Sequence, residues 1–185
     1  MKTAIVAKEL FVMGLGITGD SKRTVLILSD EMNQRAIPIW IAESDAVNLS
    51  IAIMGSESKR PLTHETMLNI IKGLGCRLEH VEISEAKDEI FFASIVISRD
   101  GALKESGREF IEIDARPSDA VALAVWSGKP LYVNPDVFDK ESVSLSVSSE
   151  GFLLSEAERN LVEEDDQEFR DFLNKVNASD FTLPE

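Results

Sequence analysis

The chain has little cysteine and no long apolar run, and each shortage excludes a class of protein. Its 185 residues include one cysteine, Cys76, which excludes an intrachain disulfide and any cysteine-cluster zinc or iron–sulfur site. A lone cysteine at the start of an apparent strand fits a reducing compartment and a small buried side chain. No apolar run approaches the roughly 20 residues of a membrane span. Lys8 and Glu9 interrupt the first apolar run, so we expect no signal peptide, no membrane partner and a cytoplasmic protein.

Basic charge is also scarce. The formal net charge is −14, from 33 Asp and Glu against 19 Lys and Arg. Residues 135–185 hold 14 of these acids and 4 of the bases, so the C-terminal segment carries most of the excess. The composition lacks the basic footprint of a general nucleic-acid binder. Any contact with a polyanion must therefore be local, transient or bridged by metal ions.

Apolar periodicity and turn residues predict the elements. We expect strands at residues 2–13, 23–29, 34–42, 76–83, 89–98, 108–115 and 130–133. We expect helices at residues 44–54, 62–73 and 117–127. The turn signal at 98–102 predicts that the two strands on either side of it pair. The stretch GLGITGD at 14–20 contains a formal G-x-G-x-x-G, but a strand-like segment follows it, so we predict a hairpin loop and not a dinucleotide site.

The sequence changes character near residue 140. We expect one domain at 1–140 and an acidic, amphipathic, helical C-terminal extension at 141–185. In this extension Ser155 and Glu158 form a capping box. An apolar helix face follows at Phe169, Phe172, Leu173 and Val176. The extension is expected either to dock on the first domain or to remain an appendage.

A near-identical hexamer, SDAVNL and SDAVAL, occurs at residues 44–49 and 118–123. It extends to IPIWIAESDAVNL over IEIDARPSDAVAL, each with an alternating strand, a short turn and a helix. We interpret this as a duplicated strand–turn–helix unit in which Ser44 and Ser118 supply capping oxygens. Asp45 and Asp119 either stabilise the helix N-terminus, by about 0.3–1 kcal/mol, or act as functional carboxylates.

The second copy brings Asp114, Arg116 and Asp119 within six residues, at a strand end and a helix start. Two carboxylates and a guanidinium at such a junction suit a divalent metal and a phosphate. An ion pair between Arg116 and Asp119 that closes the turn explains the same spacing.

The stretch RPLTHE at 60–65 is the other candidate for chemistry. It places Arg60, His64 and Glu65 at a helix start, where Thr63 is the expected N-cap. A helix N-terminus disfavours protonated histidine, so we expect His64 to be neutral. A neutral imidazole could serve as a base or as a metal ligand, and the alternative is that it makes only a polar contact. His80, in mid-strand, is expected to be structural.

Three blocks of the chain resemble the bifunctional nuclease domain family: IPIWIAESDAVNLSIAIMG, KRPLTHETMLNIIKGLG and IDARPSDAVALAVWSGKPLYV. They occur in the family's order and cover roughly residues 1–140. The resemblance implies an α+β domain that commonly self-associates, with nuclease activity on DNA and RNA. We therefore expect a mixed, largely antiparallel, curved sheet with helices packed on it, containing the duplicated unit, and a homo-oligomer, taken as a dimer.

The family's motifs map onto eight positions that are candidates for its chemistry. These are Asp45, Arg60, His64, Glu65, Asp114, Arg116, Ser118 and Asp119. The chain departs from the family in the first block, where it has Ala42 in place of a common glycine and Asp45 in place of a common glutamate.

Two functions follow from these residues. In a metal-assisted nuclease, Mg²⁺ or Mn²⁺ would be held by Asp114, Asp119 and either Asp45 or Glu65, and would activate water. His64 would act as base or ligand, while Arg116 or Arg60, with Ser118, would bind the substrate. Alternatively the chain is a non-enzymatic homo-oligomeric binding or assembly module with an acidic docking tail. Convergence of the carboxylates and His64 on one cleft would favour the enzyme.

Overall fold

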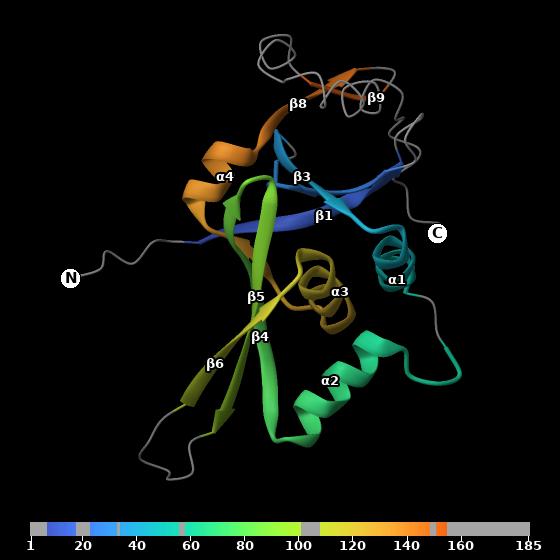
Figure 1. The fold of residues 1–185 in the computed structure, drawn as a ribbon, viewed down its shortest axis with the longest axis vertical. Helices are drawn as coiled ribbons and strands as arrows, with labels where there is room; N and C mark the ends of the chain where they lie inside the picture. The colour runs from blue at the N-terminus through green and yellow to red at the C-terminus, as the bar shows by residue number, and fades with distance from the viewer. Residues whose placement is uncertain are drawn as a thin grey trace, which may run out of the picture.

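The computed structural model describes residues 7–17, 23–32, 34–55, 58–100, 108–148 and 151–154, which form a mixed sheet with helices packed on it (Figure 1). The strands are β1 (Lys8–Ile17), β2 (Thr24–Ser29), β3 (Arg35–Ile41), β4 (Cys76–Lys87), β5 (Ile90–Asp100), β6 (Arg108–Ala115), β7 (Leu131–Val133), β8 (Val143–Ser148) and β9 (Gly151–Leu154). The helices are α1 (Glu43–Ile53), α2 (Thr63–Gly73), α3 (Pro117–Ser127) and α4 (Pro135–Glu141). The expected capping box at 155–158 and the apolar helix face at 169–176 lie outside the described residues.

The strands follow the order β6-β5-β4-β7-β1-β2-β3-β8-β9 across the sheet. Strands β4 and β7 pair in parallel, and the other neighbours pair antiparallel. This confirms the expected α+β class and largely antiparallel sheet, including the hairpin of β5 and β6. Strand β8 pairs with β3, so the sheet extends to residues beyond 140.

The duplication seen in the sequence covers more of the fold than the hexamers suggest. The order β1-β2-β3-α1 is repeated as β4-β5-β6-α3, each a three-stranded antiparallel meander followed by a helix. Helices α1 and α3 pack against each other on one side of the sheet, and α2 follows α1 on the same side (Figure 1). The two SDAV segments therefore open two neighbouring helices.

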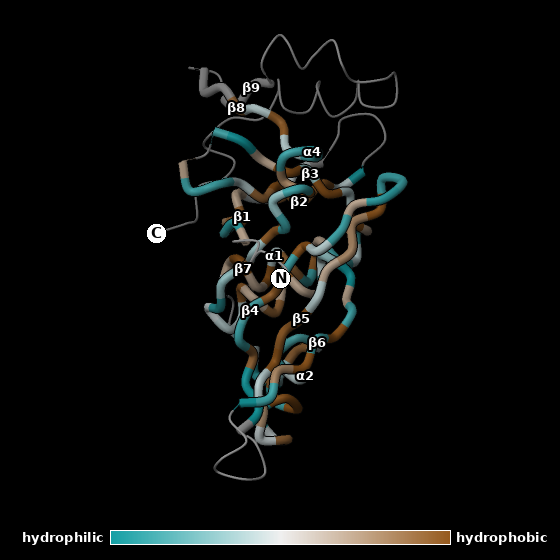
Figure 2. Tube along the Cα trace, turned by 90° about the vertical axis from the view of Figure 1, so that its left-hand side faces the viewer, coloured by the Kyte–Doolittle hydropathy of each residue, from teal (hydrophilic) through white to brown (hydrophobic). Residues whose placement is uncertain are grey.

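The main core lies between the sheet and these helices. Helix α3 is buried along most of its length, from Ala120 to Ala124, which explains its uniformly apolar sequence. It packs on β4 and β5, and Leu49 of α1 joins the same cluster with no exposed surface. Figure 2 shows apolar residues concentrated through the centre of the trace. A second, smaller cluster lies around Val25 and Ile27, so that β2 is buried on both faces.

Three local predictions are corrected by the structure. Strand β1 continues to Ile17 and pairs with β2, so Gly14 and Gly16 lie in a strand of the hairpin and not in its loop. Helices α1 and α3 have Ala42 and Arg116 as N-caps, without a side-chain cap, so the capping roles of Ser44 and Ser118 were wrong. In α3 the reason is Pro117, whose fixed φ suits the first helical position, so the N-cap is Arg116, two residues before Ser118.

The start of α2 also differs from the prediction. Leu62 is the N-cap and Thr63 is the first helical residue. The Glu65 carboxylate accepts a hydrogen bond from the Leu62 backbone N–H at 2.9 Å, which satisfies a donor at the helix start without help from Thr63.

Among the described residues, no helix is both long and apolar enough to cross a bilayer.

Candidate functional site

The N-terminal turns of α1, α2 and α3 meet at one place and join five of the predicted site residues. Helix α1 contributes Asp45, α2 contributes His64, and α3 contributes Ser118 and Asp119, with Arg116 as its N-cap. We call these five residues the junction network. Its members come from both copies of the repeat and from the helix between them.

Arg116 is the centre of the junction network. Its Nη1 and Nη2 donate to Asp45 Oδ2 and Oδ1 at 2.8 and 3.3 Å, and its Nε donates to Asp119 Oδ2 at 2.9 Å. The predicted Arg116–Asp119 ion pair is therefore present, but it is half of a larger arrangement. Ser118 Oγ donates to Asp45 Oδ2 at 3.1 Å. One guanidinium thus connects two carboxylates that are 74 positions apart in the sequence.

His64 completes the network on the side of Asp119. Its Nε2 lies 3.2 Å from Asp119 Oδ1, and the histidine is buried, with 6% of its surface exposed. A carboxylate at this position favours the tautomer with the proton on Nε2, which leaves Nδ1 as the basic nitrogen. A histidine oriented by a carboxylate is an arrangement suited to accepting a proton.

The electrostatics of the junction network follow from its hydrogen bonds. The pKa of Arg116 is raised, first by its hydrogen bond to Asp119 and then by the charges of Asp119 and Asp45. The guanidinium is therefore permanently charged. Two carboxylates and one guanidinium leave one negative charge, which three helix N-termini oppose with about +0.5 each. An anion close to these helix starts is thus tolerated in spite of the acidic composition.

A cavity of about 300 Å³ opens beside Arg116. Three segments line it: the end of β3 at 39–42, the start of β5 at 89–91, and the start of α3 at 116–118. Asp45 of the network also lines it. Apart from the charged residues Asp45, Glu89 and Arg116 and the hydroxyl of Ser118, the lining side chains are apolar or aromatic.

The other predicted site residues lie apart from this network. Asp114 pairs in register with Ser94 on β5, and strand alternation places it on the opposite sheet face from Ile113 and Ala115. Since Ala115 packs against the main core beside the helices, Asp114 faces away from the junction network. Glu65 is engaged at the start of α2, and Arg60 is exposed in the segment before that helix.

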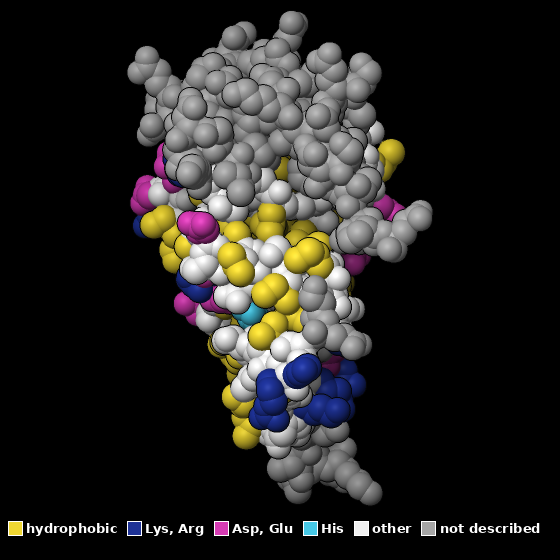
Figure 3. All heavy atoms as spheres, turned by 90° about the vertical axis from the view of Figure 1, so that its right-hand side faces the viewer, with side chains coloured by type: hydrophobic (Ala, Val, Ile, Leu, Met, Phe, Trp, Pro, Cys, Tyr) yellow, Lys and Arg dark blue, Asp and Glu magenta, His cyan; other side chains and the backbone are white. Residues whose placement is uncertain are grey.

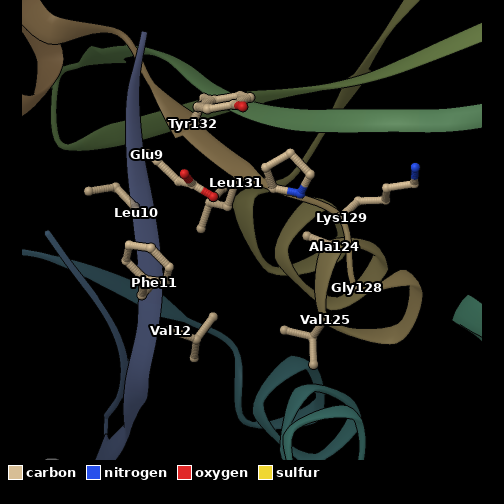
Figure 4. A pocket seen from close by; sticks show the side chains of 11 residues that line it. Glu9, Leu10, Phe11, Val12, Ala124, Val125, Gly128, Lys129, Leu131 and Tyr132 are labelled. Carbon is tan, nitrogen blue, oxygen red and sulfur yellow. The ribbon is translucent and has the colours of Figure 1, made fainter. Parts of the chain in front are cut away.

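A larger groove lies elsewhere and lacks such a network. It has a volume of about 520 Å³ between β1, the C-terminal end of α3 and β7 (Figure 4). Glu9, Lys129 and Tyr132 supply its polar groups, and Val12 and Val125 belong to its apolar lining. None of the predicted site residues lines it, whereas Asp45, Arg116 and Ser118 line the 300 Å³ cavity, which is therefore the stronger candidate.

The hydrogen bonds also decide how well the site suits a metal ion. Both oxygens of Asp45 accept hydrogen bonds from Arg116, and Oδ2 also accepts one from Ser118. In Asp119, Oδ2 accepts from Arg116 and Oδ1 lies against His64 Nε2. In the described part of the chain, no group of three or more His, Cys, Asp and Glu side chains is placed to share a metal. In this arrangement the carboxylates do not fit a metal site, because an ion between Asp45 and Asp119 would have to displace Arg116.

Sequence reasoning named the members of the junction network but not the cavity. Ile90 and Phe91 enter it from the β4–β5 turn, and Trp40 from the strand before α1. The repeat was the available signal for this cavity, because it aligns Trp40 with Asp114, which was a predicted site residue.

Comparison with known proteins gives a consistent result. The model of the bifunctional nuclease domain matches residues 26–146. An uncharacterized protein of Mycobacterium tuberculosis is 31% identical over 173 residues, which cover 94% of this chain and 97% of the relative. Bifunctional nuclease 1 of Arabidopsis thaliana is 26% identical over 132 residues, which cover 66% of this chain and 39% of the plant protein. The chain thus matches less than half the length of that plant relative.

Proposed function

This chain belongs to the bifunctional nuclease domain family, and we propose that it hydrolyses phosphodiester bonds in RNA, DNA or both. The plant relatives named bifunctional nucleases support this activity. The observation that carries the proposal is the junction network, which places a carboxylate-oriented histidine and an exposed arginine at three helix N-termini.

Arg116 is proposed to bind the phosphodiester. A guanidinium has five N–H groups, and three bonds to Asp45 and Asp119 leave two for phosphate oxygens. The side chain is 61% exposed, so a substrate can reach them. Positive charge at this position would stabilise the negative charge that develops on phosphorus oxygens in the transition state.

His64 is proposed to act as the general base. Asp119 would hold the proton on Nε2, and Nδ1 would take a proton from the attacking water. Water oxygen forms the new bond to phosphorus as the bond to the leaving oxygen breaks, and the proton returns to that leaving oxygen. Removing a general base slows a reaction by typically 10²- to 10⁴-fold.

Divalent metal ions enter this proposal as a separate, testable question. The cleavage assay below tests Mg²⁺ and Mn²⁺ as cofactors, and no step above depends on them. Since Arg116 occupies the oxygens of Asp45 and Asp119, binding of an ion there would require that Arg116 release them. Asp114, on the other sheet face, is not given a role here.

The experiment is cleavage of single-stranded RNA and DNA by highly purified protein, with Mg²⁺, with Mn²⁺ and with EDTA. The test variants are His64→Gln, Asp119→Asn and Arg116→Lys, because lysine cannot reproduce the planar bonds of arginine. His80→Gln is the matched histidine control, since His80 packs edge-on against Tyr132 away from the network, at 5.4 Å between ring centroids.

Loss of cleavage in the network variants with normal cleavage in His80→Gln would support the proposed site. Equal cleavage by all variants would reveal a contaminating nuclease or a different site. Asp114→Asn would identify that different site if it alone removed activity. Absence of cleavage in every protein would leave a non-enzymatic binding module, whose self-association light scattering would measure.

A further inference from the structure

We propose that the cavity beside Arg116 holds one unstacked nucleobase, so that the enzyme acts on single-stranded nucleic acid. This inference rests on the proposed function, whose substrate class it makes specific. It concerns residues that the network does not include, chiefly Ile90, Phe91 and Trp40.

The lining of the cavity suits a flat, apolar ring more than a phosphate or a sugar. Phe91 and Ile90 contribute an aromatic and an aliphatic side chain from the start of β5, and Ala42 adds apolar surface beyond the end of β3. Trp40 also lines the cavity, but its indole packs on the small cluster around Val25 and Ile27, on the other face of β3 from Ile39 and Ile41. Nucleobases bind to proteins without sequence preference by stacking on aromatic side chains. With a volume of about 300 Å³, the cavity lies at the lower end of small-molecule sites, which limits it to one base.

The position of Arg116 connects this cavity to the chemistry. Arg116 lines the cavity and is also the centre of the junction network. A nucleotide with its base in the cavity would therefore bring its phosphate to the guanidinium N–H groups that have no partner in the network. In a duplex the bases are stacked and paired, so a base must leave the helix to enter.

Two features fix the aromatic and apolar walls. The Trp40 indole packs on the Val25 and Ile27 cluster and has the guanidinium of Arg23 4.3 Å from its ring centroid, so it fixes the end of β3, and Phe91 is the ring proposed to stack on a base. On the opposite wall, Ile90 follows a two-residue turn in which Asp88 and Glu89 have positive φ angles of 50° and 63°. Positive φ at both central residues is what a tight hairpin turn of type I′ requires, and this turn fixes the position of Ile90 at the start of β5.

The exposed apolar side chains of α1 and α2 provide a control surface. Figure 3 shows apolar side chains gathered over the face that carries these helices. Ile70 of α2 is 56% exposed there, and Ile90 at the cavity is 60% exposed. The pair Ile90→Ala and Ile70→Ala therefore compares the same substitution at equal exposure, inside and outside the proposed base site.

The first experiment uses full-length Trp126→Phe protein, in which Trp40 is the single remaining tryptophan. Trp40 fluorescence is followed during titration with adenosine 5′-monophosphate, ribose 5-phosphate and inorganic phosphate. We expect adenosine monophosphate to bind about 10-fold more tightly than ribose 5-phosphate, from the stacking of one base. Ile90→Ala should weaken that binding about 5-fold, and Ile70→Ala less than about 2-fold.

Equal affinity for the two sugar phosphates, or equal effects of Ile90→Ala and Ile70→Ala, would overturn the base site. A second measurement compares binding of a labelled single-stranded octanucleotide and of its duplex, in a His64→Gln background and in EDTA, so that neither the proposed His64-dependent cleavage nor any metal-dependent cleavage interferes. Tighter binding of the single strand, with a smaller difference in Ile90→Ala protein, would support the inference. Equal binding of the single strand and the duplex would refute it.

The outcomes separate this inference from the proposed activity. Cleavage that depends on His64 but shows no preference for single strands would keep the nuclease and remove the base site. Selective nucleotide binding in a protein that cleaves nothing would keep the base site and remove the nuclease.

Discussion

The bond between Asp45 and Arg116 should stabilise the fold more than an ordinary surface ion pair. It joins the two copies of the repeat, because Asp45 lies in α1 and Arg116 at the start of α3. The perturbation that tests it is a double-mutant cycle of Asp45→Ala and Arg116→Ala, singly and together. The cycle removes effects that each substitution has on its own and leaves the energy of their interaction.

The magnitude follows from the exposure of the two partners. The Asp45 side chain is 12% exposed, but the Arg116 side chain is 61% exposed, so solvent screens the pair on one side. Opposite charges about 3 Å apart attract by about 5 kcal/mol at an effective dielectric constant near 20, and loss of hydration offsets most of this. A bidentate bond with one buried partner should retain about 1–2 kcal/mol, above the range of about 0.2–1 kcal/mol typical of exposed pairs.

Urea unfolding of the four proteins measures this interaction energy from the shift in free energy of unfolding. The control is the same cycle on Arg99 and Glu109, a single bond of 2.7 Å whose partners are both 53% exposed. That pair should give a smaller interaction energy than Asp45–Arg116 and lose most of it in 1 M salt. An Asp45–Arg116 energy no larger than this control would refute the reasoning.

Three further predictions concern stability. Ser98→Ala should raise the pKa of Glu79, because the hydrogen bond from Ser98 is the largest cause of its lowering. A lowered folded-state pKa stabilises the protein at pH values above the usual pKa of 4.5, and this stabilisation is lost as the pH falls through the folded-state pKa. Urea unfolding at several pH values should therefore show this part of the difference from wild type in full at pH 7 and not at low pH. Glu89→Gly should raise the free energy of unfolding by about 0.5–1 kcal/mol because its φ of 63° suits glycine, and an unchanged or lower melting temperature would contradict the turn geometry. Leu49→Ala, in the core, should lower the free energy of unfolding by about 2–5 kcal/mol. Val47, on the same helix, is 56% exposed, so Val47→Ala should change the free energy of unfolding by less than about 0.5 kcal/mol. Equal effects of the two substitutions would show that α1 packs by another face.

The elements that the sequence predicted well are those whose boundaries depend on neighbouring residues. Helix α3 occupies residues 117–127 as expected, since Pro117 opens it and Gly128 ends it with a φ of 61°. The hairpin of β5 and β6 also follows from local alternation and a turn signal. The helix caps were predicted less well: Ser118 donates its hydroxyl to Asp45 instead of capping α3, and α1 begins two residues before Ser44 would allow, with Ala42 as its N-cap.

Long-range pairing limited the prediction of the site. The bond between Arg116 and Asp119 spans three residues and follows from helix geometry, so it was among the alternatives. Asp45 is 71 residues from Arg116, and only the packing of α1 against α3 brings them together. Asp114 shows the opposite effect: it lies in β6 on the sheet face away from the helices, whereas Arg116, two positions later, has left the strand and is the N-cap of α3.

The chemistry of the site arises where the two copies of the repeat differ. Asp45 and Asp119 occupy equivalent positions in α1 and α3, but Ala42 stands where the second copy has Arg116, so one guanidinium serves both carboxylates. Each carboxylate then has a different further partner. Ser118 donates to Asp45, whereas His64 from α2, which follows the first copy alone, lies against Asp119. A symmetrical pair of ion pairs would only join two helices. Because the partner of Asp119 is a histidine, where Asp45 has a serine, this junction contains a group able to accept a proton.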